Sequence, residues 1–459
     1  MIGMVHHHLR RGGVTRVMYA HARILCEAGE EVMIFTGEAP ADPVPEGVRI
    51  RVLPELGYRD DYSETEVENC LRALRSEAGA DLLWHVHNHS LGKSPVYTAA
   101  LCRMAAAGEA MVFQPHDFAE DGRPANLRLL RKTLPDFPRQ LYPIGPHIRY
   151  AVLQARDAEI LCKAGVPRDA VRLLPNPMSG NAELLAPADP PRRVLYLSRC
   201  IRRKNLGEFL LWAAKAGDEL EFATSLIPEN PGELPRFRRW RDLASDMNLP
   251  VQFGLGMAAD KTFDDVAGWS DLCMTTSVGE GFGMSFLEPF LLDRPLFGRD
   301  LPEITAGFKA DGVCLDALYP ELPVPVDMLD DAFWPRALSS LQTWREAMEI
   351  SDPLQLEHLQ ATWVREGRID FGRLDEPAQE SVLSQSDALN LEWPRNFPKD
   401  TRVHNRDRIA EAYGSEATLR RLQELYAGLQ DAKPETTHAD ATQVRDAFLS
   451  LDGLSLLRS

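Results

Sequence analysis

Short apolar runs alternate with helical stripes along this 459-residue chain, and this alternation restricts its fold more than any other feature. Residues 1–8 have the pattern of a strand, and a glycine-containing loop follows at residues 10–13. Apolar residues at helical spacing then extend to Ala28, and the next apolar run covers residues 31–36. A strand–helix–strand series of this kind builds a doubly wound sheet of parallel strands. The sequence therefore predicts an α/β fold.

The alternation is interrupted at residues 186–191, which are rich in proline and poor in apolar side chains. This composition is typical of a linker between domains. A second series begins with an apolar run at residues 194–197. We therefore predict an N-terminal domain over residues 1–180, a second α/β domain over residues 190–414 and a helical segment over residues 415–459.

Two further local patterns concern the first domain. Ser94-Pro95 combines a good N-cap residue with a first-turn proline and so predicts the start of a helix. Residues 120–146 are rich in Arg, Pro and Leu, and we expect an irregular stretch there.

Composition argues against several classes of protein. The net charge is −17, of which residues 1–180 contribute −1 and the remainder −16, so we expect no nucleic-acid partner. No apolar run approaches the length of a membrane span, and the first eight residues are too short and too histidine-rich for a signal peptide. The seven cysteines are scattered and form no Cys-x-x-Cys, which suits reduced thiols. We expect a cytoplasmic protein without an integral membrane segment.

A glycine-rich turn at residues 277–289 follows an apolar run that reads as a buried strand. Gly281 and Gly283 would let the backbone come close to a ligand. A helix expected over residues 286–292 would direct free N–H groups toward an anionic or hydroxyl-rich ligand. The turn is therefore a candidate binding site.

Two glutamates bracket this turn. We expect Glu280 to lie in the turn and Glu288 to lie about a turn and a half into the helix. A carboxylate at such a place can accept hydrogen bonds from vicinal hydroxyls, as acids do with ribose in nucleotide sites. The alternative is a plain glycine turn with two solvated glutamates.

Two cations form a second candidate site. Arg199 and Lys204 lie just after the strand expected at residues 194–197 and before a helix that starts near Asn205. This placement suits a diphosphate, because arginine offers a bidentate fork and lysine a compact point charge. The alternative is a solvated basic turn, and we expect the neighbouring residues 202–203 to be solvated.

Histidines near the ends of the first strands raise the question of a metal site, at positions 6–8, 85, 87 and 89. Alternate positions on a strand end without an Asp or Cys partner at ligand spacing are a poor zinc pattern. We expect these histidines at the C-terminal ends of parallel strands, where ligands bind in such sheets. The chain also lacks Asp-x-Asp, so we predict no metal and no tightly bound cofactor.

Both candidate sites together resemble the signature of a known family. Glu280-Gly281-Phe282-Gly283, with Glu288 after four further residues, and a strand followed by Arg199-x4-Lys204 resemble retaining, nucleotide-sugar-dependent glycosyltransferases of the GT-B architecture, family 4 type. The resemblance covers roughly residues 1–430. It implies two Rossmann-like domains facing across a cleft, with the closing helices of residues 415–459 packed back on the N-terminal domain.

The resemblance also implies roles for the donor side. The enzyme would transfer a hexosyl group from a UDP- or GDP-linked sugar to a hydroxyl acceptor with retention at the anomeric carbon. Arg199 and Lys204 would stabilise the departing diphosphate, which can replace a metal. Glu288 would hold the ribose. The sugar hydroxyls would be fixed by Glu280 and by the amides of Gly281, Phe282 and Gly283.

On the N-terminal side, His116 follows an expected strand at residues 110–114 and resembles the family's histidine that contacts the donor hexose. The alternative is a structural histidine paired with Asp117. The loop of Gly12 and Gly13 is expected near the acceptor, as is His87. We expect a small soluble acceptor.

Some segments depart from the family pattern. Asn176-Pro177 replaces the usual Asn-Gly, and residues 320–400 match no known part of it. Two other functions therefore stay open. One is a nucleotide-sugar epimerase or phosphorylase of the same architecture, and the other is a catalytically silent binding subunit.

Overall fold

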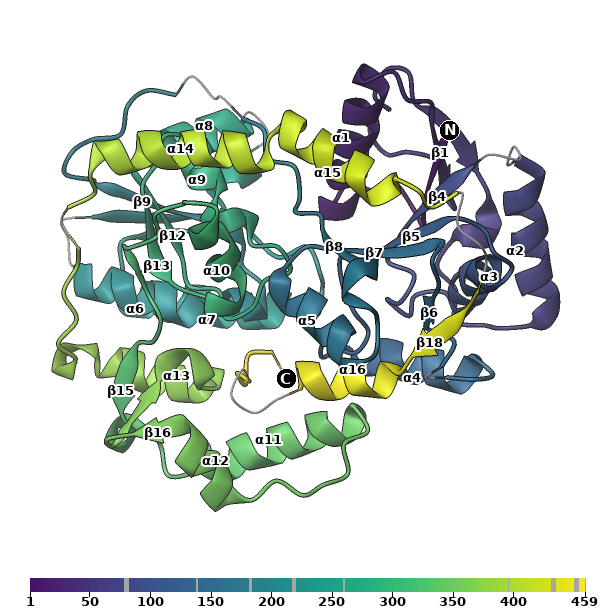
Figure 1. The fold of residues 1–459 in the computed structure, drawn as a ribbon. Coiled ribbons are helices and arrows are strands. Elements are labelled where there is room, and N and C mark those ends of the chain that lie inside the picture. Colours follow the sequence, from purple (N-terminus) through teal and green to yellow (C-terminus); the bar gives the residue numbers. More distant parts are fainter. Residues whose placement is uncertain are drawn as a thin grey trace. The chain divides into compact units, whose positions relative to one another are not determined.

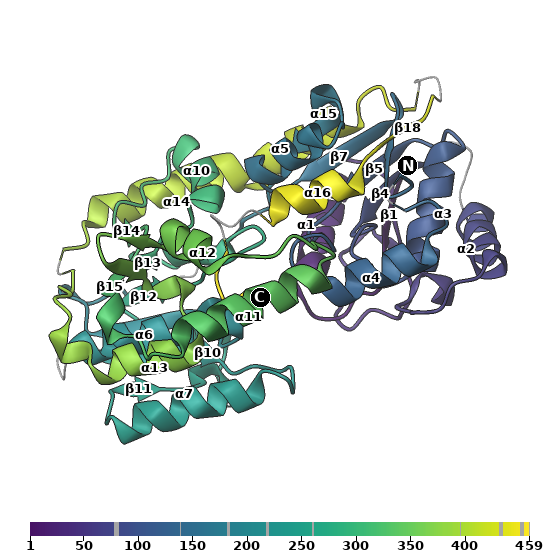
Figure 2. The same ribbon diagram turned by 90° about the horizontal axis from the view of Figure 1, so that it is seen from below.

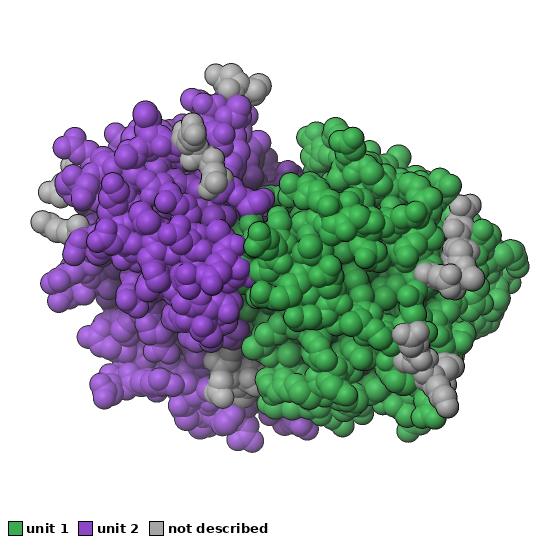
Figure 3. Space-filling model, turned by 45° about the horizontal axis from the view of Figure 1, so that its top comes forward, with its two compact units in different colours: residues 1–178, 413–450 green, residues 179–412, 451–459 purple. Residues whose placement is uncertain are grey.

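The computed structural model describes residues 1–77, 82–137, 139–180, 184–216, 220–258, 261–394, 396–430, 435–449 and 454–458. The chain forms two compact units, residues 1–178 with 413–450 (unit 1) and residues 179–412 with 451–459 (unit 2) (Figures 1 and 3). The polypeptide therefore passes between the units three times. Residues 415–459, which we expected to return to the N-terminal domain, are shared between the units.

Unit 1 contains a sheet of seven parallel strands in the order β3-β2-β1-β4-β5-β7-β8 (Figure 1). After β1 the chain adds β2 and β3 on one side of the sheet, and then β4, β5, β7 and β8 on the other side. The switch point therefore lies between β1 and β4, which are hydrogen-bonded neighbours. Ligands bind at such switch points, outside the carboxyl ends of the strands. The strands are β1 (Ile2–His6), β2 (Val32–Thr36), β3 (Arg49–Val52), β4 (Leu83–His87), β5 (Met111–Gln114), β7 (Ile148–Val152) and β8 (Val171–Leu173).

The helices of unit 1 confirm the local signal at Ser94-Pro95. Ser94 caps α3, where its hydroxyl accepts a hydrogen bond of 3.2 Å from the Tyr97 N–H, and Pro95 occupies the first turn. The helices are α1 (Gly13–Glu27), α2 (Glu64–Glu77), α3 (Pro95–Ala106), α4 (Pro124–Thr133), α5 (Ala155–Lys163), α15 (Ser415–Tyr426) and α16 (Ala441–Phe448), with short 3₁₀ turns η1 (Pro54–Leu56) and η2 (Arg168–Ala170).

The irregular stretch expected over residues 120–146 is wrong. The stretch contains α4 and a strand, β6 (Tyr142–Ile144). Leu127 and Leu130 bury one face of α4. β6 pairs antiparallel with β18 (Thr437–Ala439), which lies far later in the chain. A partner that distant leaves no signal in the local sequence.

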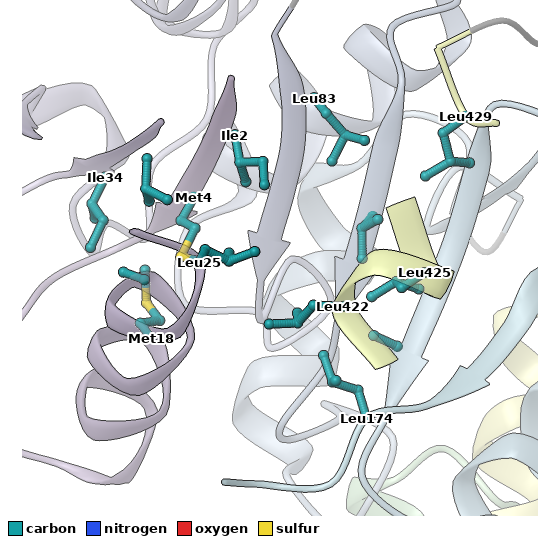
Figure 4. Packing of buried hydrophobic residues seen from close by; sticks show 14 of the residues in the cluster. Ile2, Met4, Met18, Leu25, Ile34, Leu83, Leu174, Leu422, Leu425 and Leu429 are labelled. Carbon is teal, nitrogen blue, oxygen red and sulfur yellow. The ribbon is translucent and has the colours of Figure 1, made fainter. Parts of the chain in front are cut away.

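The core of unit 1 contains residues from the first strands and from α15, which lie far apart in the sequence. Leu422 and Leu425 of α15 lie in the same buried cluster as Met4 of β1 and Leu83 of β4 (Figure 4). Leu422 and Leu425 are almost completely buried. Full burial of one leucine contributes about 2 kcal/mol, so α15 is an integral part of this unit.

Unit 2 contains six parallel strands in the order β11-β10-β9-β12-β13-β14, the strand order of a Rossmann-like sheet. Its switch point lies between β9 and β12, which are neighbours in the sheet (Figure 1). The strands are β9 (Arg193–Arg199), β10 (Glu221–Leu226), β11 (Val251–Gln252), β12 (Leu272–Thr275), β13 (Leu296–Arg299) and β14 (Leu318–Tyr319).

The helices of unit 2 cover this sheet and extend into the region that the sequence left unassigned. They are α6 (Leu206–Ala216), α7 (Leu234–Asp246), α8 (Phe263–Trp269), α9 (Glu288–Leu291), α10 (Pro302–Ala310), α11 (Phe333–Ala347), α12 (Leu356–Trp363), α13 (Glu376–Ser384) and α14 (Lys399–Tyr413). In the described part of the chain, no helix is long and apolar enough to cross a membrane.

Residues 320–400 form a defined subdomain of unit 2. Three short antiparallel strands, β15 (Pro323–Pro325), β17 (Arg368–Asp370) and β16 (Val364–Arg365), pair in that order. α13 packs along α6, the helix that follows the predicted Lys204 motif (Figure 2). The subdomain therefore lies against one of the elements that position the site.

Candidate active site

The site of unit 2 is built from two loops that leave neighbouring strands. One loop follows β9 and carries residues 200–205, and the other follows β12 and carries residues 276–283. The strands pair in register, with Met274 opposite Tyr196, so both loops emerge at the same edge of the sheet. This edge is the switch point, where parallel α/β sheets bind ligands.

Hydrogen bonds fasten the two loops to each other. The Tyr196 hydroxyl donates to the carbonyl of Lys204. The Thr276 hydroxyl lies 3.1 Å and 3.0 Å from the carbonyl oxygens of Lys204 and Asn205, to which it can donate. The Val278 N–H donates to the Arg203 carbonyl at 2.9 Å. These bonds hold the backbone of Lys204 in place and so limit where its side chain can point.

Lys204 and Glu280 form an ion pair across the two loops. The Lys204 Nζ contacts the Glu280 Oε1, and their side chains are only 10% and 8% exposed. Arg203 donates to the Gly279 carbonyl at 2.6 Å, and its Nη1 lies 3.4 Å from the Glu280 Oε2. Two cations thus contact one carboxylate at the switch point, and Glu288 also acts electrostatically on Lys204.

Burial and charge act in opposite directions on this pair. Burial alone would raise the pKa of Glu280, but Lys204 and Arg203 outweigh it and hold this pKa below its ordinary value. Burial lowers the pKa of Lys204, against the attraction of Glu280. Glu280 is therefore ionised at neutral pH and keeps Lys204 in place as an ion pair.

The glycine turn is shaped by Gly283. Its φ of +90° lies in the left-handed region, and a Cβ there would lie 2.7 Å from Ile304 and 2.9 Å from the Phe286 ring. Phe282 is 5% exposed, and its ring packs edge-on to Phe308 at 5.3 Å. Phe282 therefore belongs to the core, and only its backbone could serve a ligand.

The helix expected over residues 286–292 is present but shorter than predicted. A 3₁₀ turn covers Met284–Phe286, and α9 starts at Glu288 and has only four residues. Pro289 explains the break, because a proline lacks an N–H group and favours the first turn of a helix. Glu288 is half-buried in that first turn, and so short a helix gives no support to the expected row of free N–H groups.

Arg199 and Arg203 make contacts that the sequence analysis did not predict. Arg199, at the end of β9, pairs with Glu229 at 2.9 Å, and its side chain is 46% exposed. The structure thus brings Lys204 and Glu280 together, whereas it gives Arg199 a partner on the loop after β10. Arg203 is exposed, as we expected, with 44% of its side chain accessible, and it also contacts the glutamate loop. The position of Arg203 next to Lys204 in the sequence could have indicated this contact.

A buried polar network contacts Asn205 in the loop of residues 200–205, and we call it the Arg299 network. Asn205 donates to Glu208 at 2.7 Å, and the Arg299 guanidinium contacts Glu208 at 2.6 Å. The same guanidinium donates to both oxygens of Asp370 at 2.8 Å. Gln379 of α13 donates to the Asn205 Oδ1 at 2.8 Å.

The Arg299 network explains part of the unassigned region. Asp370 and Gln379 come from the subdomain of residues 320–400, and Glu208 and Arg299 are 0% and 4% exposed in their side chains. Asn205 follows Lys204 directly and adopts a left-handed φ of +55°. The subdomain therefore fixes the residue next to the site lysine.

Unit 1 carries a column of imidazoles at the carboxyl ends of β4 and β5. His85 stacks on His87 with ring centroids 4.6 Å apart, and His87 stacks on His116 at 5.2 Å. The His87 Nδ1 and the His116 Nε2 share a hydrogen bond of 2.9 Å. His21 of α1 adds a fourth ring, 6.1 Å from His85. The structure thus brings His87 and His116 together.

Asn88 positions His116. Its Oδ1 accepts from the backbone N–H groups of His116 at 2.7 Å and of Asp117 at 3.2 Å. The alternative of a pair between His116 and Asp117 is not what the contacts show, since Asp117 pairs with Arg123. Burial lowers the pKa of His116 to about 3, so this imidazole is neutral at physiological pH.

The remaining histidine contacts have a structural character. His85 bonds to the Tyr426 hydroxyl at 2.7 Å and to Gln114 at 2.9 Å. Across the described residues, no group of three or more His, Cys, Asp or Glu side chains is arranged to hold a metal ion.

The Gly12 and Gly13 loop is exposed at the start of α1. A Cβ on Gly12 would come no closer than 4.0 Å to the Arg10 carbonyl, and one on Gly13 would meet nothing within 4 Å. The two glycines are therefore not required by crowding inside the protein. Their backbone is open to a ligand from solvent.

Comparisons with known proteins agree with this architecture. The model of glycosyltransferase family 4 matches residues 11–179. A curated relative, mannosylglucosyl-3-phosphoglycerate synthase of Petrotoga mobilis, is 26% identical over 339 residues, which cover 66% of this chain and 65% of that protein. The match thus spans just under two thirds of the relative's length.

Two solved structures show the fold. Sucrose-phosphate synthase of Thermosynechococcus elongatus superposes with a TM-score of 0.56 at 16% identity, over 94% of this chain and 99% of that one. Anabaena HepE in complex with UDP-glucose gives 0.53 at 12% identity, over 92% and 98%. The fold defines the GT-B class of two Rossmann-like domains. The match of residues 11–179 to the model of glycosyltransferase family 4 agrees with this class.

Proposed function

We propose that this protein transfers a hexosyl group from a nucleoside diphosphate sugar to a hydroxyl of a small acceptor, with retention at the anomeric carbon and without a metal. The observation that carries the proposal is the Lys204–Glu280 pair with Arg203 at the switch point of unit 2. The ammonium and guanidinium groups there suit a diphosphate. Anabaena HepE, whose structure was solved in complex with UDP-glucose, supports a donor of this class.

Lys204 can serve two partners at once. An ammonium group has three N–H donors, so Lys204 can keep its bond to Glu280 and donate to a phosphate oxygen. As the glycosidic bond breaks, negative charge grows on the departing diphosphate, and cations already in place stabilise it without reorganisation. Arg203 adds a second cation, and Arg199 could join if it left Glu229.

The sugar would be held by acceptors and donors of both loops. Glu280 has lone pairs beyond those that meet Lys204, and they can accept from sugar hydroxyls. Glu288, in the first turn of α9, is the candidate for the ribose hydroxyls. In unit 1, His87 occupies the Nε2 of His116, which leaves the neutral Nδ1 to meet a hexose hydroxyl.

A small anionic glycoside is the acceptor class that we favour. The curated relative is named for a product built on phosphoglycerate, a small phosphorylated acid. The residues 1–180 are nearly neutral in net charge, in contrast to the acidic remainder, so an anionic acceptor meets little repulsion there.

The test is a transfer assay with UDP-glucose and GDP-mannose as donors and glucosylglycerate or its phosphorylated form as acceptors, in the presence of EDTA. We expect a glycosylated product with the anomeric configuration of the donor, and we expect Lys204→Ala to lower kcat/KM by at least about a hundredfold, the loss typical of one transition-state donor. Release of sugar without transfer for every acceptor tried would overturn the acceptor class. Unchanged turnover by Lys204→Ala would overturn the site.

Assays without acceptor separate the rival functions. A product that forms from donor alone would indicate an epimerase, and dependence on inorganic phosphate would indicate a phosphorylase. A protein that binds nucleotide but never cleaves the donor would be a silent binding subunit. The buried Lys204–Glu280 pair favours turnover, because it would hold a cation where we propose that the diphosphate leaves.

A further inference from the structure

The segment of residues 454–458 returns to unit 2 after the chain has passed through unit 1, and we call it the return segment. Leu454, Leu456 and Leu457 are 5% exposed or less, which shows that the segment is packed into the unit. The Ser455 hydroxyl donates to the Gly372 carbonyl at 2.6 Å. The return segment is therefore anchored beside the subdomain of residues 320–400.

The anchor point adjoins the Arg299 network. A Cβ on Gly372 would lie 2.6 Å from the Arg299 Cζ, so the Gly372 backbone packs directly on that guanidinium. Leu457 lines a small cavity together with Arg202, Asn205 and Gln379. Two separate observations thus place the return segment next to the loop that carries Lys204.

The last described residue of this segment reaches the glutamate loop. A Cβ on Gly279 would lie 3.0 Å from the Arg458 Nε and 3.4 Å from its Cζ, so the arginine side chain lies directly on the Gly279 backbone. The Gly279 carbonyl accepts the bond from Arg203, and Glu280 follows in the chain. Arg458 is half-buried, and its backbone N–H donates to the Ser455 carbonyl at 2.9 Å in a turn that directs it there.

Three cations therefore gather around the Gly279–Glu280 loop: Arg203, Lys204 and Arg458. Residues 181–459 carry a net charge of −16, so the cluster is an exception to the charge of its surroundings. Glu280 contacts two of these cations, Arg203 and Lys204. A guanidinium offers a planar fork that fits two phosphate oxygens, which a lysine does not.

We propose that Arg458 is a donor-binding residue that supplies a guanidinium to the diphosphate of the nucleotide sugar. This inference rests on the proposed function of the same site. The bidentate contact with the diphosphate that we expected from Arg199 would then come from Arg458. The glycine at position 279 suits this contact, because a Cβ there would crowd the Arg458 side chain.

The experiment measures the affinities of UDP, GDP and ADP by calorimetry for the wild type, Arg458→Gln and Arg458→Lys, at low and high salt. We expect Arg458→Gln to lower the affinity for the nucleoside diphosphate that binds by about tenfold, which corresponds to the loss of one charge-assisted hydrogen bond. The affinity for the corresponding nucleoside monophosphate should fall by less. Arg458→Lys should lie between, because it keeps the charge and loses the fork.

Two further variants guard against an indirect effect. Gly279→Ala needs no left-handed backbone and keeps every charge, yet its methyl group would lie 3.0 Å from the Arg458 Nε and crowd that side chain. We therefore expect it to weaken binding of the diphosphate in the same direction as Arg458→Gln. Arg241→Gln, an exposed arginine of α7 paired with Asp242, is the matched control and should leave affinity unchanged.

The outcomes separate the two claims. Tight binding of a diphosphate by the wild type and equal binding by Arg458→Gln and Gly279→Ala would overturn the role of Arg458 and leave the proposed function intact. Absence of binding by the wild type would overturn both. Equal loss for the diphosphate and the monophosphate, with a lowered melting temperature, would make Arg458 a structural residue only.

Discussion

Lys204 and Glu280 lie 76 positions apart in the chain and form a buried ion pair where β9 and β12 end side by side. The pair is internal to unit 2. Its cost of burial is met by Coulomb attraction and by Arg203. A buried charge pair contributes little to stability by itself, so its presence at the switch point argues for a function.

Removal of one partner should destabilise the protein. Lys204→Met leaves the Glu280 carboxylate buried beside Arg203 alone, and we expect the free energy of unfolding to fall by about 3 to 5 kcal/mol. The measurement is chemical denaturation at pH 7. In the double variant with Glu280→Leu, much of this stability should return while nucleotide binding stays absent. Equal stability of Lys204→Met and the wild type would contradict the buried pair.

The Arg299 network should be needed for both stability and site geometry. Asp370→Ala removes two bonds of 2.8 Å from Arg299 and one of 2.8 Å from the Leu322 N–H. We expect a loss of about 2 to 4 kcal/mol and weaker binding of nucleoside diphosphate, measured by denaturation and calorimetry.

The matched control is Asp330→Ala in the same subdomain. Asp330 pairs with Arg336, but the two side chains are 38% and 33% exposed. Solvent screens such a pair, and we expect a loss below about 1 kcal/mol with no change in affinity. A larger loss for Asp330→Ala than for Asp370→Ala would refute the ranking.

Gly283→Ala should damage the turn for two reasons. The backbone has a φ of +90°, and the added methyl group would lie 2.7 Å from Ile304. We expect a loss of about 2 kcal/mol or more and a large loss of donor binding. Gly367→Ala has a φ of +71° but open space around the Cβ, so it reports the backbone cost alone. Equal effects of the two changes would show that crowding at Gly283 is unimportant.

Stability should fall as the pH falls below neutrality. Burial lowers the pKa of His6 and His85 to about 4 and of His89 and His116 to about 3. The unfolded chain takes up protons on histidine near pH 6.5, whereas the native state does not, so the unfolded state binds more protons between these values. Lowering the pKa of one histidine by one unit costs about 1.4 kcal/mol of stability once that histidine must be protonated. Glu120 opposes this trend, because burial raises its pKa to about 8.

The measurement is the free energy of unfolding from pH 7.5 to pH 4.5. His89→Gln should reduce the slope by about one proton, or 1.4 kcal/mol per pH unit near pH 5. A stability that rises as the pH falls over this range would contradict the buried neutral imidazoles.

Local patterns were sufficient where the chemistry is local. The Arg199-x4-Lys204 and Glu280 motifs pointed to one site, and the structure brings Lys204 and Glu280 together. The strand–helix alternation predicted the α/β class, since each unit has a parallel sheet with helices. The Ser94-Pro95 cap also required no distant partner.

The remaining features depend on distant parts of the chain. Arg458 reaches Gly279 because the chain returns to unit 2, and Asp370 reaches Arg299 through a small antiparallel sheet. β6 exists because β18 pairs with it. Glu288 was misplaced because we extended a helix through Pro289, although that proline marks a helix start.

The most direct test of the central claim is the melting temperature of the protein with UDP, GDP, ADP or NAD, first in EDTA and then with magnesium. We predict that one nucleoside diphosphate raises the melting temperature without metal, and that Lys204→Ala abolishes the rise. A protein that binds none of the three diphosphates, or that is stabilised by NAD alone, would contradict the account.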